Sequence, residues 1–282
     1  MAGPGGPAGP GGTGGASGRW RPPLLWRAAQ LAARGLVAAL ARLRVTGDVP
    51  ARRWPDRSAP GPLILAANHI SPFDPIALTA ACRRCRIAPR FLAAAELFAH
   101  RVLGPVMRHW GHIPVHRGTP TATRALPEAA AALATGSVVV LYPEGGIGLD
   151  PGLWPQRGRS GVGRLALVTG APVVPVALWG AHEVVPYTAP RGLLRALPST
   201  IRRRPVVRVR FGAPVDLSGL RPDRPGDARR ATDRIVAAIT AQLAPLRVNE
   251  PDRPRHLDPT RPSRPSRAAR AVPSGPDPLA QE

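Results

Sequence analysis

Lysine is absent from this chain of 282 residues, so all 39 of its basic residues are arginines. Only 17 acidic residues oppose them, and the formal net charge is +22. A charge of this size attracts anionic partners such as lipid headgroups, phosphorylated small molecules, coenzyme A or nucleic acid. Aromatic residues make up only 4% of the chain. Because a surface that stacks nucleic-acid bases needs aromatic side chains, we expect no nucleic-acid partner.

Cysteine is scarce as well. Cys82 and Cys85 form a single Cys-x2-Cys pair, whereas a structural zinc site normally has four ligands. Three histidines in the segment 109–116 are close enough in sequence to suggest a metal, but Gly111 and Pro114 disfavour the continuous helix that would bring them together. We therefore expect a pair of reduced thiols and no bound metal.

No long hydrophobic run is present that would predict a membrane-spanning helix. Residues 20–45 are rich in Leu and Ala, but Arg27, Arg34 and Arg42 interrupt them, and a spanning helix needs about 20 mostly apolar residues. On a helical projection these arginines and Gln30 share one face and the leucines share the opposite face. We predict an amphipathic helix over 20–45 that lies on an anionic membrane, at the cytoplasmic face of the cell membrane, with packing against its own domain as the alternative.

The two ends of the chain differ from its middle. Residues 1–19 are almost entirely Gly, Pro, Ala and Ser, and residues 247–282 are rich in Pro and Arg without apolar periodicity. Such segments bury too little apolar surface to offset their ordering entropy, so we predict two disordered tails. The remaining residues, 46–246, are long enough for one domain with a hydrophobic core.

Strand-like and helix-like segments alternate along the predicted domain. The expected strands are 62–67, 90–92, 112–116, 137–142, 173–178 and 206–211, and the expected helices are 75–82, 123–134, 161–169 and 232–243. This alternation is typical of α/β proteins. We predict a single layered α/β domain with a mixed, largely parallel sheet flanked by helices.

His69 and Asp74 lie in the predicted connection between the strand 62–67 and the helix that follows it. A free imidazole has a pKa of about 6.5, so a carboxylate that holds one ring N–H leaves the other nitrogen able to take a proton from a hydroxyl group. The pair is therefore a candidate general base that works without a serine. Asp74 followed by Pro75 also suits the start of a helix, so a structural role for Asp74 is the alternative.

Four short blocks resemble, in order, the signature blocks of the glycerolipid acyltransferase family, which includes the 1-acylglycerol-3-phosphate acyltransferases. They are Asn68-His69-x4-Asp74, the segment 111–117 (GHIPVHR), the segment 142–146 (YPEGG) and the segment 174–176 (VPV). Four ordered blocks are far more specific than any one of them. The resemblance extends over about residues 46–215 and implies a fold like that of glycerol-3-phosphate acyltransferase.

The resemblance implies a role for the residues in these blocks. His69 is the expected general base, and Asp74 fixes its tautomer and stabilises the imidazolium. Arg117 is expected to bind the phosphate of the acceptor, because a guanidinium matches phosphate geometry with paired hydrogen bonds. Glu144 is expected to face the substrate and to hold Arg117 or a glycerol hydroxyl, and Asn68 is a candidate to stabilise the oxyanion.

The sequence departs from the family pattern after Gly145, a residue that we expect to form a tight turn beneath the ligand. The family commonly has a hydroxyl residue and then a basic or polar residue there, whereas this chain has Gly146 and Ile147. A phosphate contact is therefore missing. Three arginines slightly further along the chain are candidates to replace it: Arg157, Arg159 and Arg164.

The resemblance as a whole implies transfer of a fatty acyl chain to the sn-2 hydroxyl of 1-acylglycerol 3-phosphate, which gives phosphatidate in phospholipid biosynthesis. Acyl-CoA or acyl carrier protein is the expected thioester cosubstrate, and no other cofactor is expected. One alternative is the same chemistry on another lysolipid or glycolipid. An alternative of another class is a non-catalytic basic protein that binds membranes or nucleic acid. The sequence predicts no oligomeric state.

Overall fold

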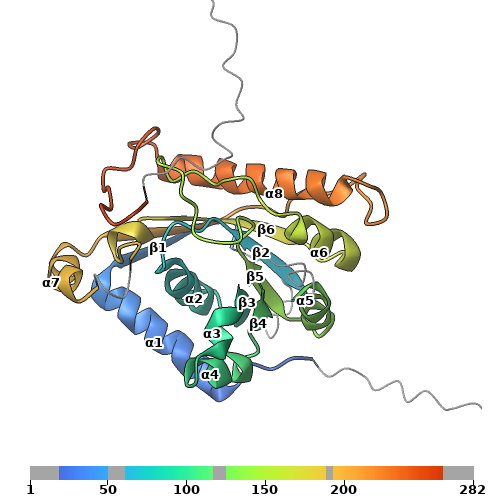
Figure 1. Ribbon diagram of the computed structural model, residues 1–282, viewed down its shortest axis with the longest axis horizontal. Helices are drawn as coiled ribbons and strands as arrows, with labels where there is room; N and C mark the ends of the chain where they lie inside the picture. The colour runs from blue at the N-terminus through green and yellow to red at the C-terminus, as the bar shows by residue number, and fades with distance from the viewer. Residues whose placement is uncertain (1–18, 50–60, 117–124, 189–192, 263–282) are drawn as a thin grey trace, which may run out of the picture.

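In the part of the chain that the structure describes, a seven-stranded sheet lies between two layers of helices (Figure 1). A computed structural model describes residues 19–49, 61–116, 125–188 and 193–262. The strands are β1 (Arg42–Gly47), β2 (Leu63–Ala67), β3 (Pro89–Ala94), β4 (Ile113–Val115), β5 (Val138–Leu141), β6 (Val173–Trp179) and β7 (Val206–Phe211). Their order is β1-β7-β6-β2-β5-β3-β4, and every neighbouring pair is parallel except β6 with β7. The predicted mixed, largely parallel α/β fold is therefore confirmed.

Helices cover both faces of the sheet. They are α1 (Leu24–Leu40), α2 (Asp74–Arg84), α3 (Ala95–Ala99), α4 (Leu103–His109), α5 (Ala125–Ala134), α6 (Gly161–Thr169), α7 (Leu193–Arg203) and α8 (Asp227–Leu243), with short 3-10 turns η3 (Ala181–Glu183) and η4 (Ala244–Leu246). The buried side chains of α1 and α2 share one core with the sheet, and those of α5, α6 and α8 share the other.

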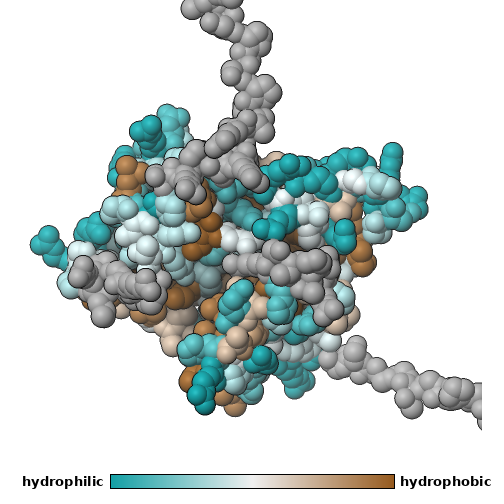
Figure 2. Space-filling view, in the orientation of Figure 1, coloured by the Kyte–Doolittle hydropathy of each residue, from teal (hydrophilic) through white to brown (hydrophobic). Residues whose placement is uncertain are grey.

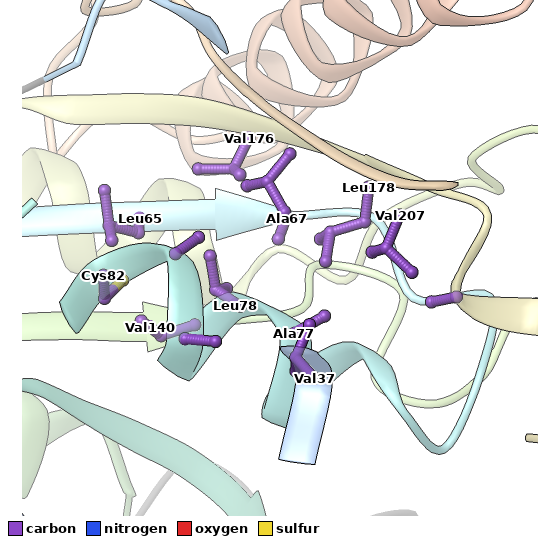
Figure 3. Close-up of a cluster of buried hydrophobic side chains, with 14 of the residues drawn as sticks. Val37, Leu65, Ala67, Ala77, Leu78, Cys82, Val140, Val176, Leu178 and Val207 are labelled. Carbon is purple, nitrogen blue, oxygen red and sulfur yellow. The ribbon is translucent and has the colours of Figure 1, made fainter. Parts of the chain in front are cut away.

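The strand β2 lies at the centre and contributes to both cores. Leu65 faces the core beneath α1 and α2, and Ile64 faces the core beneath α5, α6 and α8. Figure 3 shows the first core, where Leu65 and Val140 of the sheet lie close to Leu78 and Cys82 of α2. Every residue of β2 is buried, which is expected for a parallel strand covered on both faces. The first sequence block begins directly after this strand.

The predicted helix over residues 20–45 is shorter in the structure. It ends at Leu40, because Ala41 is extended (φ −152°, ψ 169°), and residues 42–47 form the edge strand β1 instead. The alternation of Leu43 and Val45 with arginines is a strand pattern, and β1 pairs in parallel with β7. We did not predict this change from helical to strand periodicity. The sequence analysis also did not predict the short helices α3 and α4 or the helix α7.

The helix α1 packs against α2 and has an additional exposed apolar edge. Trp26 and Gln30 are buried, and the Gln30 side chain, which we expected on the solvent-facing basic side, donates from Nε2 to the carbonyl of Ile87 (2.9 Å). Leu24 and Leu25 remain 79% and 63% exposed. Among the described residues, no helix is both long and apolar enough to cross a membrane. A membrane surface as the partner of α1 stays a prediction.

Residues 247–262, which we expected to be part of a disordered tail, are bound to the domain; we call them the C-terminal strap. Arg247 is buried, and its guanidinium lies between two indole rings, 4.1 Å from the ring centre of Trp154 and 4.4 Å from that of Trp179. Trp154 also donates from Nε1 to the carbonyl of Pro251 (3.2 Å). Composition alone missed these contacts, because the partners of the strap belong to the rest of the domain.

Candidate active site

The first and third sequence blocks meet at one end of the sheet. The parallel strands β2 and β5 are in register, with Ala66 opposite Leu141, so the residues that follow each strand emerge side by side. Residue His69 follows β2, and Glu144 follows β5. Carboxyl ends of parallel strands are where α/β proteins usually bind ligands. The pairing of strands brings together two blocks that are 75 residues apart.

Asp74 holds the imidazole of His69. Oδ2 of this fully buried carboxylate lies 2.9 Å from Nδ1 of the ring. The same oxygen accepts the backbone N–H of Ile70 (2.6 Å) and of Ser71 (2.8 Å), so the loop itself fixes the carboxylate. Asp74 is also the first residue of α2, followed by Pro75. Its structural role and its predicted orienting role are therefore compatible.

The other ring nitrogen of His69, Nε2, is the atom available for chemistry. With a proton on Nδ1 directed at Asp74, Nε2 carries a lone pair, and no described residue hydrogen-bonds to it. The ring of Tyr142 stacks beneath the imidazole, with centroids 4.2 Å apart and planes 20° apart. Burial and then the negative charge of Asp74 raise the pKa of Tyr142, so the phenol stays neutral. Sequence reasoning included Tyr142 in a block but did not predict this supporting contact.

Glu144 links the loop that carries His69 to the loop after β5. Its Oε1 accepts the backbone N–H of His69 (3.0 Å), and its Oε2 accepts that of Gln156 (3.1 Å). Burial raises the pKa of Glu144 to about 7, although both N–H groups and the guanidinium of Arg261 lower it. The resemblance implied a carboxylate that faces the substrate, whereas the structure directs both oxygens to backbone groups.

Asn68 is held by the sheet. Its amide makes two hydrogen bonds with the backbone of Leu178 in β6, donating from Nδ2 to the carbonyl (3.0 Å) and accepting at Oδ1 from the N–H (2.7 Å). The side chain is 1% exposed. These partners differ from the oxyanion that we expected, and they make Asn68 a clamp between β2 and β6.

Gly145 forms the tight turn that we expected, with φ at +77°. The side chain of Arg159 lies over it, since a Cβ at this glycine would be only 2.6 Å from Arg159 Nε. Arg159 and Arg164 line a cavity of about 470 Å³, which we call the arginine-rimmed cavity. Arg157 is exposed and does not line it. Of the three candidate arginines, two therefore face one cavity beside Gly145.

A second cavity, which we call the apolar cavity, has a volume of about 330 Å³. His69 and Tyr142 form part of its wall. The other lining residues come from α1, α2, β3, α3, α4 and the connection between α4 and β4: Trp26, Ala29, Ala33, Pro75, Ile76, Thr79, Phe91, Leu92, Ala93, Ala94, Leu97, Met107, Trp110 and His112. Tyr142 borders both cavities, so the imidazole lies where they approach each other.

Arg117, the predicted phosphate ligand, lies outside the described residues. Of the three histidines in the second block region, His112 is buried and its Nδ1 accepts the backbone N–H of Phe91 (3.2 Å). Burial and then the charge of Arg90 lower the pKa of His112 to about 4, so its ring is neutral. Within the ranges that the structure describes, no three side chains gather in a way that could hold a metal ion.

Known proteins that resemble this chain provide evidence independent of the geometry of the site. The model of the acyltransferase family matches residues 42–179. Uncharacterized proteins of Mycobacterium tuberculosis and Mycobacterium bovis are each 33% identical to the chain over 147 residues. A chloroplastic 1-acyl-sn-glycerol-3-phosphate acyltransferase of Brassica napus is 28% identical over 138 residues. Each alignment covers 49% of this chain and 38% of the relative.

The matched region contains the four sequence blocks, the His69–Asp74 pair and most of the residues around both cavities. Over residues 42–179, just under half of its length, the chain therefore matches the acyltransferase family.

Proposed function

We propose that the protein transfers a fatty acyl chain from acyl-CoA or acyl carrier protein to the sn-2 hydroxyl of 1-acylglycerol 3-phosphate, giving phosphatidate. The observation that carries the proposal is the His69–Asp74 pair, whose geometry leaves Nε2 free at the wall of an apolar cavity. The match to the acyltransferase family supports the acyl transfer, and the Brassica napus relative supports the acceptor.

The chemistry follows from the two atoms of the imidazole. Nε2 of His69 takes the proton of the acceptor hydroxyl as its oxygen attacks the thioester carbonyl. The tetrahedral intermediate then collapses, the C–S bond breaks, and the imidazolium returns the proton to the leaving thiolate. Asp74 stabilises the imidazolium between these steps. General-base assistance of this kind contributes about 10²- to 10⁴-fold, and no acyl-enzyme forms.

The two cavities suit different parts of the two substrates. The apolar cavity offers a wall of aliphatic and aromatic side chains to an acyl chain. The arginine-rimmed cavity offers two guanidinium groups to the phosphate of the acceptor. Because Tyr142 borders both cavities and stacks on His69, ligands in them would bring the hydroxyl and the thioester carbonyl to Nε2.

The test is thiol release from palmitoyl-CoA and from palmitoyl-acyl carrier protein by the purified protein, each measured with a panel of acceptors. The panel contains 1-acylglycerol 3-phosphate, a lysophospholipid with a larger headgroup, a glycolipid and a phosphate-free monoacylglycerol. Release that depends on 1-acylglycerol 3-phosphate, with phosphatidate as the product, supports the proposal. Release with the glycolipid or the other lysolipid alone would assign the same chemistry to another acceptor, and no release with any acceptor would overturn the proposal.

Arg117→Ala and Arg159→Ala are each expected to raise the KM for 1-acylglycerol 3-phosphate by about tenfold or more, since a charge-assisted hydrogen bond contributes about 1.5–3 kcal/mol. Initial rates over a range of acceptor concentrations measure this effect. Arg117→Lys should restore only part of the affinity, because an ammonium cannot make the paired contact. Arg157→Ala is the matched control. An equal loss with the phosphate-free acceptor would show that these arginines do not serve the phosphate.

We also propose that the protein works as a peripheral protein on an anionic membrane, at its cytoplasmic face. Leu24 and Leu25 are exposed near the start of α1, close to Arg21 and Arg27. Leu97, which lines the apolar cavity, is itself 43% exposed. Figure 2 shows hydrophobic surface at the lower edge of the molecule, where the ends of α1 and α4 lie in Figure 1. Such a surface would place the apolar cavity close to the lipid substrate.

Replacing both Leu24 and Leu25 with Ser is expected to weaken binding to anionic vesicles by about tenfold or more, because each exposed leucine can bury apolar area in the lipid. Co-sedimentation across a salt series measures it, and salt should weaken the binding of the unsubstituted protein by screening its arginines. Val168→Ser, on the exposed side of α6, is the control. If the variant with Ser at positions 24 and 25 bound vesicles as well as Val168→Ser, α1 would have a structural role and no role in membrane binding.

A further inference from the structure

The C-terminal strap reaches the loops that form the candidate active site. The guanidinium of Arg261 donates from Nη1 to the carbonyl of Ile70 (2.8 Å) and from Nη2 to the carbonyl of Gly148. Ile70 is 191 residues away in sequence and immediately follows His69. A side chain from the end of the described chain therefore contacts the backbone beside the candidate general base.

The two carbonyls belong to two different loops, and both loops meet at His69. The backbone N–H of Gly148 donates to the carbonyl of His69 (2.8 Å), and the carboxylate of Glu144 accepts the N–H of His69 (3.0 Å). The loop after β2 and the loop after β5 are thus joined by three sets of contacts. Arg261 is the only one of these that comes from outside both loops.

Contacts of the strap before Arg261 hold this residue in place. Before it, Arg247 is fixed between two indole rings and donates from Nη2 to the carbonyl of Glu250 (2.9 Å). Near its end, the carboxylate of Asp258 accepts the backbone N–H of Tyr187. The guanidinium of Arg261 also lies 5.9 Å from the ring centre of Tyr187. These anchors limit the positions that the guanidinium can occupy.

The charge of Arg261 faces two carboxylates of the site. Burial lowers the pKa of Arg261, whereas the charges of Asp258 in the strap, Asp74 on α2, Tyr187 and Glu144 after β5 raise it. The charged groups that act on Glu144 are Asp74, which raises its pKa, and Arg261, which lowers it. Arg261 therefore favours the ionised Glu144, the form that accepts both backbone N–H groups.

We propose that Arg261 is a positioning residue of the acyltransferase site, which holds the loop of His69 against the loop of Glu144, and that the C-terminal strap is thereby part of the active site. This inference rests on the proposed function for its effect on turnover. Its effect on the two loops does not depend on which substrate the protein uses.

The test compares Arg261→Ala, Arg261→Lys and Arg261→Gln with Arg253→Ala, which removes one exposed arginine of the same strap. Arg261→Ala should lower kcat by about 10- to 100-fold with little change in KM, because misplacing a base by about 1 Å has effects of this size. Arg261→Lys keeps the charge but cannot reach both carbonyls, so we expect reduced kcat with an unshifted pH profile. Arg261→Gln lacks the charge, so the acid limb of its kcat profile should move to higher pH.

Hydrogen exchange of the backbone N–H groups of His69 and Gly148 gives a readout that is independent of activity. Exchange should be faster in the three Arg261 variants than in Arg253→Ala, even if palmitoyl-CoA and the acceptor panel show no turnover. If Arg261→Ala does not fold, the Lys and Gln variants decide the question. Unchanged exchange at both groups, or an equal kcat and pH profile in the Lys, Gln and Arg253→Ala proteins, would overturn the proposal.

Discussion

His69→Ala is expected to lower kcat by about 10²- to 10⁴-fold while the fold is retained, because the substitution removes the base and leaves the hydrogen bonds of the loop backbone in place. Asp74→Asn is expected to cause a loss of similar order. An asparagine oxygen can still accept the N–H groups that Asp74 binds in the loop, but it no longer stabilises an imidazolium. Thiol release under saturating substrate, with circular dichroism of each variant, measures both effects.

The losses of kcat caused by His69→Ala and Asp74→Asn should not multiply in the double variant, because the histidine and the aspartate act as one unit. The double variant should be about as slow as His69→Ala alone. His109→Ala, which removes an exposed histidine, is the matched control. A double variant slowed by the product of the single losses, or near-normal turnover in His69→Ala, would show that the pair is not the catalytic unit.

Glu144→Gln is expected to flatten the pH dependence of stability. Burial raises the pKa of Glu144 from its ordinary 4.5 to about 7, so between these values the folded protein binds more protons than the unfolded chain. The contribution of protonated Glu144 to stability is therefore fully present below about pH 4.5 and is lost as the pH rises to about 7. This loss is a change of about 3 kcal/mol in the free energy of unfolding. Glutamine has no such titration.

Denaturant unfolding of both proteins at pH 5 and pH 8 measures this difference. Glu96→Gln, at an exposed position in α3, is the control and should follow the unsubstituted protein. If Glu144→Gln lost as much stability between the two pH values as the unsubstituted protein, Glu144 would not be the group that responds to burial. The same experiment on Arg261→Ala should show a larger loss, because the guanidinium favours the ionised form.

Local periodicity predicted most of the elements near the site. The helix expected at 161–169 has the same bounds as α6, and the strand expected at 206–211 is β7. Periodicity gave the wrong boundary where one element follows another without a turn signal. This occurs at Ala41, between the end of α1 and the start of β1. Gln30 was misplaced for a related reason, since the face of α1 that becomes buried depends on α2 and on the carbonyl of Ile87.

The sequence alone determined the candidate base and its partner, because His69 and Asp74 are five residues apart in one loop and that spacing is local. It also determined the tight turn at Gly145. Only the tertiary structure decided what Asn68, Glu144 and Arg261 contact, because their partners are 110, 75 and 191 residues away. Pairing of β2 with β5 and β6 creates the contacts of Asn68 and Glu144, and the anchored C-terminal strap brings Arg261 to the site. Strand pairing depends on the burial of complete faces, which no short segment encodes.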